Sequence, residues 1–145
     1  QGVSSAASDV YKRQVYYASV TIPTASVLTL NTTPLAIVAA PGAGLAIQLV
    51  AGTASMTYNT TPYATNGKFG LITQGAVEYQ SLLSANGFLF GTVTRTVSLT
   101  ARPTNLITDT QLIANAPLLV QVDTADPTAG DSDITVTVLY RILPI

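Results

Sequence analysis

The stretch LLVQVDTADPTAGDSDITVTVLYRILP, from Leu118 to Pro144, decides the fold class of this chain. Toward both of its ends, apolar residues occupy every second position, which is the pattern of a β-strand with one buried face. The segment between them, Ala125 to Ser132, is rich in the turn-forming residues Asp, Pro and Gly. We therefore expect two strands joined by a turn, with their buried positions at the centre of the protein. Those positions are Leu118, Val120, Val122, Val136, Val138 and Tyr140.

The same alternation recurs along the whole chain, and no long helical period interrupts it. Further strands are expected at Val15–Ile22, Ser26–Leu30, Leu35–Ala40, Leu45–Tyr58, Lys68–Thr73 and Phe88–Ala101. Ala76–Leu83 is compatible with either a strand or one or two helical turns. About eight or nine short strands, separated by turn signals, predict an all-β protein. We expect one antiparallel β-sandwich domain of jelly-roll type over residues 15–145.

One apolar stretch, LAIVAAPGAGLAIQLVAG from Leu35 to Gly52, approaches the length that a transmembrane helix needs. Pro41 and Gly42 lie in its middle, and such residues punctuate a chain as a turn. We therefore predict a buried β-hairpin at this place rather than a membrane span.

Charged residues make up only 9% of the 145 residues, while hydrophobic residues make up 48%. An ordinary globular chain has about 25% charged residues. Since obligate interfaces resemble a core cut in half, we expect neighbouring subunits to cover part of this surface. A homo-oligomer, with a trimer favoured, is therefore expected. Arg95 interrupts the apolar face of its predicted strand, which indicates a strand end or an interface.

The chain contains no His and no Cys, so the commonest general base and the thiolate metal ligands are both missing. Ser and Thr are plentiful, but no G-x-S-x-G motif accompanies them. The net charge of −1 provides no basic patch for nucleic acid. We predict that the protein is not an enzyme, has no cofactor and binds neither nucleic acid nor membrane.

Two groups of residues are candidates for a binding site. Asp123, Asp126, Asp131 and Asp133 cluster around one turn, where they would act as solvated turn-forming acids or, alternatively, bind Ca²⁺. Tyr58 and Tyr63 flank an uncharged loop, where their rings would either pack on the sandwich or contact a sugar or receptor.

The segment SSAASDVYKRQ, Ser4 to Gln14, resembles the translation of an adaptor used in sequencing libraries. Such a resemblance implies that residues 1–14 are non-native and were never selected to pack. We expect them to be disordered, and the natural sequence to start near Val15.

Three stretches make up much of the remaining chain: SVTIPTASVLTLNTTPLAIVAAPGAG, the YATNG loop and LIANAPLLVQVDTADPTAGDSDITVTVLYRI. Their resemblance is to small uncharacterised β-rich structural proteins of tailed bacteriophages. It implies a virion protein, either a head decoration or a head- or tail-fibre module, that associates with other virion proteins. The alternative is a lectin-like module that binds a carbohydrate or receptor, such as a glycan of the host surface.

Overall fold

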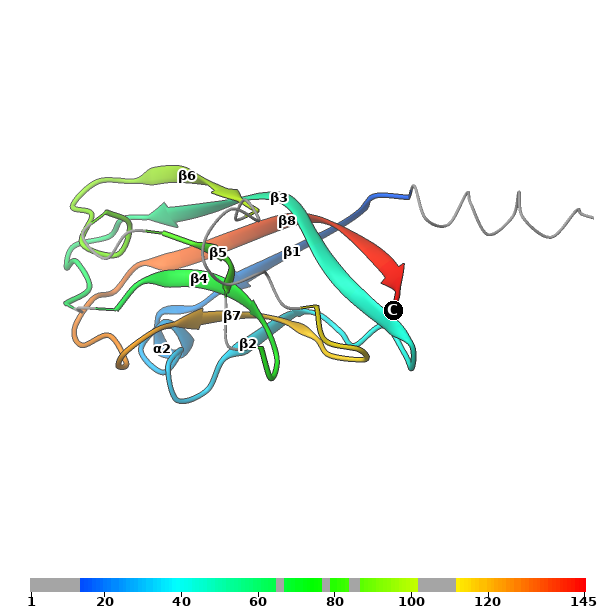
Figure 1. The fold of residues 1–145 in the computed structure, drawn as a ribbon. Coiled ribbons are helices and arrows are strands. Elements are labelled where there is room, and N and C mark those ends of the chain that lie inside the picture. The colour runs from blue at the N-terminus through cyan, green and yellow to red at the C-terminus, as the bar shows by residue number, and fades with distance from the viewer. Residues whose placement is uncertain (1–13, 65–66, 77–78, 84–86, 102–111) are drawn as a thin grey trace, which may run out of the picture.

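The alternating segments form two four-stranded antiparallel sheets that pack face to face (Figure 1). This is a computed structural model, and it describes residues 14–64, 67–76, 79–83, 87–101 and 112–145. The strands are β1 (Tyr16–Ile22), β2 (Leu35–Val38), β3 (Leu45–Thr57), β4 (Phe69–Thr73), β5 (Tyr79–Leu82), β6 (Arg95–Thr100), β7 (Leu118–Val122) and β8 (Asp133–Pro144). The expected all-β antiparallel sandwich is confirmed.

The strand order is β1-β8-β3-β6 in the first sheet and β2-β7-β4-β5 in the second. Successive strands change sheet at every connection except the one from β4 to β5. The chain therefore passes back and forth between the two sheets and winds around the core that they enclose.

The core lies between the two sheets and is built from the residues that the opening stretch indicated. Leu118, Val120 and Val122 of β7 are fully buried, as are Val136 and Val138 of β8. Tyr140 is half-buried and packs against the same core. β7 and β8 each lie between two other strands, which explains why their inward side chains are shielded from solvent on every side.

The predicted hairpin between Leu35 and Tyr58 is wrong in its pairing. Both strands form, as β2 and β3, but β2 belongs to the second sheet and β3 to the first. The connection that contains Pro41 and Gly42 therefore passes from the second sheet to the first. Alternation identifies the buried face of each strand, but two such faces can lie side by side or opposite each other.

The predicted strand Ser26–Leu30 is also wrong. Thr24–Val27 forms a single helical turn, α2, which follows Pro23 directly. Val27 and Leu30, three residues apart, are both fully buried. This spacing fits one face of a helical turn, and the segment is too short for sequence periodicity to reveal it.

The strand expected at Phe88–Ala101 is shorter in the structure, because β6 begins only at Arg95. Arg95 accordingly lies at a strand end, as expected. Tyr79–Leu82 resolves the ambiguous segment 76–83 as a strand. The expected non-native segment 1–14 lies outside the described residues, apart from Gln14. Among the described residues, no helix has the length and apolar character needed to cross a bilayer.

Candidate functional site

The outer side of the first sheet carries two rows of hydroxyl side chains. Each row runs across the sheet and takes one Ser or Thr from each of its four strands. The strand register places the members of each row directly beside one another. One row is Ser19, Thr137, Thr53 and Ser98, and the next is Thr21, Thr135, Ser55 and Thr96. We call these two rows the hydroxyl face.

The hydroxyl face arises from alternation within the strands. In β8, Thr135 and Thr137 point outward, while Val136 and Val138 between them are fully buried. β-branched residues favour such a pleated, half-buried surface. The hydroxyls also bond to one another across strands: Ser19 and Thr137 lie 3.0 Å apart, oxygen to oxygen. The alignment into rows depends on the register between strands that are distant in sequence, so no local pattern predicts it.

A third row continues this surface with three hydrophobic residues and one threonine. Tyr17, Leu139, Ala51 and Thr100 are its members, again one from each strand. Tyr17 is 67% exposed and Leu139 is 40% exposed. All three rows are free of charged residues, so a partner that covered them would desolvate no ionised group. Hydroxyl side chains both donate and accept hydrogen bonds, so they can bond to a neutral protein surface.

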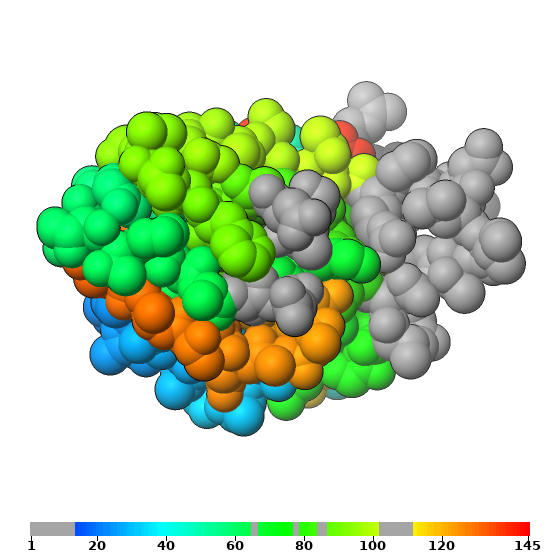
Figure 2. All heavy atoms as spheres, turned by 90° about the vertical axis from the view of Figure 1, so that its left-hand side faces the viewer, coloured from blue at the N-terminus to red at the C-terminus, as the bar shows by residue number. Residues whose placement is uncertain are grey.

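At one end of the sandwich, the aspartates of the turn between β7 and β8 bind the backbone of neighbouring loops. Figure 2 views this end, with the segment 123–132 in orange between the green and blue loops. Asp126 accepts hydrogen bonds from the backbone N–H groups of Asn31 at 2.7 Å and Thr32 at 3.0 Å. Asp131 accepts them from Thr60 at 3.1 Å and Thr61 at 2.9 Å.

The other two carboxylates have similar roles. Asp133 accepts a hydrogen bond from the N–H of Thr24 at 3.0 Å, at the start of α2. Asp123 accepts one from the N–H of Lys68, just before β4. Each carboxylate therefore holds a loop that is distant in sequence.

These contacts lower the pKa of two of the carboxyl groups. The hydroxyl of Thr60 makes the largest contribution at Asp131, followed by the N–H groups of Thr61 and Thr60, and together they lower its pKa. At Asp126, desolvation raises the pKa, but the hydrogen bonds from Thr32 and Asn31 outweigh it, so the net shift is downward.

The Ca²⁺ interpretation of Asp123, Asp126, Asp131 and Asp133 receives no support from their placement. Within the described ranges, no three acidic residues converge on a position that could hold a metal ion. The contacts described above engage each of the four carboxylates with protein donors instead. Cation binding here stays an untested prediction.

The two candidate tyrosines have different environments. Tyr63 is 1% exposed, and its hydroxyl donates to the carbonyl of Ser132. The ring of Tyr63 is therefore packed inside the sandwich in this structure, and a ligand contact at Tyr63 stays an untested prediction. Tyr58 is half-buried, and its hydroxyl donates to the carbonyl of Thr60 at 2.6 Å. A ligand contact at Tyr58 stays a prediction.

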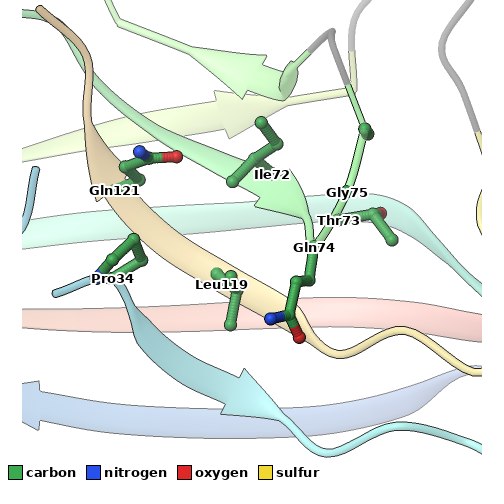
Figure 3. Close-up of a pocket in the computed structure, with 8 residues that line it drawn as sticks. Pro34, Ile72, Thr73, Gln74, Gly75, Leu119 and Gln121 are labelled. Carbon is green, nitrogen blue, oxygen red and sulfur yellow. The ribbon is translucent and has the colours of Figure 1, made fainter. Parts of the chain in front are cut away.

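A pocket of about 340 Å³ lies on the outer side of the second sheet, beside the turn that follows β4 (Figure 3). In this view Leu119 lies between Pro34 and Gln74, and Gln121 lies further along β7. The pocket's other lining residues are Ile72, Thr73, Gly75 and Ala76. None of the lining residues is ionisable, so they provide amide hydrogen-bonding groups and apolar contacts but no acid–base chemistry.

One residue that the sequence analysis did not identify links the two sheets from within. Gln80 of β5 is 2% exposed, and its side-chain amide bonds to the backbone of β3 at Ile47 and Leu49. The only sequence signal for a buried polar residue here is the position of Gln80 within residues 76–83, a segment whose pattern fits either a strand or a helical turn.

No protein-family model matches this chain, and no curated protein matches it in sequence. One solved structure has a similar fold. It is a chain of the cyanophage Pam1 capsid asymmetric unit. The similarity covers 90% of this chain and 84% of that chain, with a TM-score of 0.50 and 15% sequence identity. At that identity the likeness concerns the fold alone, and the adaptor interpretation of Ser4–Gln14 stays a prediction.

Proposed function

We propose that this protein is a structural component of a bacteriophage virion and that it acts by packing against other protein subunits rather than by catalysis. The observation that carries the proposal is the uncharged outer surface of the first sheet. Its hydroxyl rows and the adjoining row with Tyr17 and Leu139 form a surface suited to a neutral protein partner. The capsid protein of similar fold supports a virion location for such a surface.

The jelly-roll interpretation forms part of this proposal. Its support is the strand order, in which β1-β8-β3-β6 faces β2-β7-β4-β5. Eight-stranded jelly rolls of this kind occur in viral capsids and in lectins. The finer role, as a head decoration or as a module of a head or tail fibre, follows only from the sequence resemblance.

Self-association is tested by analytical ultracentrifugation of the purified chain over a range of micromolar concentrations. We expect a concentration-dependent shift from monomer to oligomer, because charge-poor surface favours burial. A chain that stays monomeric throughout would contradict self-assembly. The virion location is tested by the genes that flank the coding sequence, which we expect to encode capsid, portal or tail proteins.

The alternative, a module that binds a carbohydrate or host receptor, has its more accessible candidate in Tyr58, since Tyr63 is buried. A glycan array tests this binding alternative. Specific binding that is lost in Tyr58→Ala, but retained in Tyr17→Ala, would favour this alternative over a purely structural role.

A further inference from the structure

The four edge strands of the sandwich differ in how they are protected against pairing with another chain. Natural sheets protect an exposed edge by short length, a bulge, a proline or an inward-pointing charge. β2 is four residues long and its register shifts between Ala36 and Val38. β5 is also four residues long, with a shift in its pairing to β4. β6 begins with Arg95 on the inner side of its sheet.

β1 has none of these protections. Its seven residues, YYASVTI, contain no charge, proline or glycine. Its register with β8 runs without a shift from Tyr16 opposite Tyr140 to Ile22 opposite Ile134. As an end strand, it has a hydrogen-bonding partner strand on one side only among the described residues.

The inner side of β1 is also incompletely covered. Ala18 and Val20 are half-buried, although the residues beside them on β8, Val138 and Val136, are fully buried. Two inward-facing apolar side chains therefore remain partly exposed along this edge, although the core residues beside them are buried. A further strand placed there would cover the two side chains as well as the unpaired backbone groups.

Elsewhere in the same sheet, an unpaired edge is covered from within the chain. β6 pairs with β3 only from Ala51 to Met56, so the first part of β3 has no neighbouring strand on that side among the described residues. Gln80 bonds to Ile47 and Leu49 there, and the backbone N–H of Asn115 bonds to the carbonyl of Leu45 at 2.7 Å. The described residues provide no such cover for β1.

We propose that β1 pairs with β1 of a second copy of this chain, antiparallel and about a two-fold axis at Ser19. A strand paired with itself in this way keeps inward residues opposite inward residues, so Ala18 lies opposite Val20 of the second copy. The two first sheets then form one continuous sheet, and the hydroxyl faces of both copies join. Tyr17 lies opposite Thr21 of the second copy.

This inference rests on the proposed self-assembly and specifies its contact. It replaces the trimer expected from the sequence by a two-fold pair, which gives assemblies with an even number of chains. The second copy is the favoured partner because β1 and the adjoining hydroxyl face are uncharged, so two copies can meet there without repulsion between like charges.

Disulfide trapping gives the direct test, because the chain has no cysteine of its own. In the proposed pair, residue 19 of each copy faces residue 19 of the other, with Cα atoms about 4.5–5.5 Å apart. A disulfide spans roughly 4.4–6.8 Å between Cα atoms. Ser19→Cys is therefore expected to form a covalent dimer on mild oxidation. Ser98→Cys, at an exposed position of β6 in the same hydroxyl row, is the matched control and is expected to stay uncrosslinked.

A charge exchange gives the second test and does not depend on a covalent bond. Ser19→Lys places two like charges opposite each other, so we expect the dimer dissociation constant to rise about tenfold or more. Mixing Ser19→Lys with Ser19→Glu should restore pairing, while Ser98→Lys should behave like the wild type. Unchanged far-UV circular dichroism would show that each variant remains folded.

The outcomes separate this inference from the proposed function. A wild-type oligomer that neither crosslinks through Ser19→Cys nor weakens with Ser19→Lys would overturn the β1 contact and leave self-assembly standing. A trimer as the sole species would do the same. A wild type that is monomeric at every concentration would overturn both.

Discussion

The backbone N–H of Leu49 in the first sheet donates a hydrogen bond to the side-chain oxygen of Gln80 in the second sheet, at 2.6 Å. The amide nitrogen of Gln80 donates in turn to the carbonyl of Ile47 at 3.0 Å. The two backbone groups lie two residues apart, on the edge of β3 that β6 leaves unpaired. A primary amide offers one acceptor and two donors, so Gln80 replaces the missing strand at this point.

Gln80→Leu is expected to lower the free energy of unfolding by about 2–4 kcal/mol, because it leaves two buried backbone groups without partners. Urea denaturation monitored by circular dichroism measures the change. Gln121→Leu is the matched control. Gln121 lies half-buried on the outer side of β7, so its replacement should change the free energy by about 0.5 kcal/mol or less. Equal effects of the two substitutions would contradict the role given to Gln80.

The strands of this protein were predictable because their inward and outward residues alternate strictly. In β8, Ile134, Val136 and Val138 are fully buried, while the residues between them are at least partly exposed. The same alternation did not reveal the hydroxyl rows, because a row requires the register between strands far apart in sequence, such as those of Ser19 and Thr137.

The errors arose where local pattern does not determine the partner. Neither β2 nor β3 has a sequence feature that indicates the sheet to which it belongs. The spacing of Val27 and Leu30 covers a single helical turn, which is shorter than any reliable period. The roles of Gln80 and Tyr63 depend on contacts with Leu49 and Ser132, and no residue near them in sequence indicates those contacts.

Gly130 and Gly75 provide a test of how tightly the turn between β7 and β8 is packed. Gly130 lies in that turn, and Gly75, in the turn after β4, serves as the comparison. Both have a positive φ, 88° at Gly130 and 83° at Gly75. An added Cβ at Gly75 would meet nothing within 4 Å, whereas at Gly130 it would overlap the ring of Tyr63. Gly75→Ala should therefore lower the free energy of unfolding by about 1–2 kcal/mol, because alanine disfavours the left-handed backbone conformation.

Gly130→Ala should lower the free energy of unfolding by the same backbone contribution and by about 1–3 kcal/mol more, because the Tyr63 ring has to move within a packed site. The difference between the two variants, measured by thermal and urea unfolding, isolates the steric contribution. Similar losses in both would show that the loop adapts and that Tyr63 is not tightly held.

Stability is expected to fall in acid as Asp131 and Asp126 become protonated. Both groups have a pKa in the folded protein below the ordinary value of 3.8. Their contribution is therefore fully present above pH 3.8 and is lost as the pH falls through the folded-state pKa. Melting temperatures measured from neutral to acidic pH should reveal this loss.

Thr60→Val tests whether Asp131 contributes to that loss, since the Thr60 hydroxyl is the largest cause of its lowered pKa. The melting temperature of this variant should lie below that of the wild type at neutral pH, and the gap should narrow below pH 3.8. Thr53→Val, on the hydroxyl face, is the control, and its gap should not depend on pH. A constant gap for Thr60→Val would contradict the carboxylate contact.

Tyr63 and Tyr58 allow the same chemical change to be made in a buried and in a more exposed setting. Tyr63→Phe removes the donor to the carbonyl of Ser132, a residue that is 1% exposed, so that carbonyl loses its partner away from water. We expect a loss of about 1–2 kcal/mol in the free energy of unfolding. Tyr58→Phe removes the donor to the carbonyl of Thr60, which lies in an exposed residue where water can replace the donor. Its expected loss is about 0.5 kcal/mol or less. A larger loss at Tyr58 than at Tyr63 would reverse the two environments and would contradict Tyr63 as the residue that anchors the loop to the core.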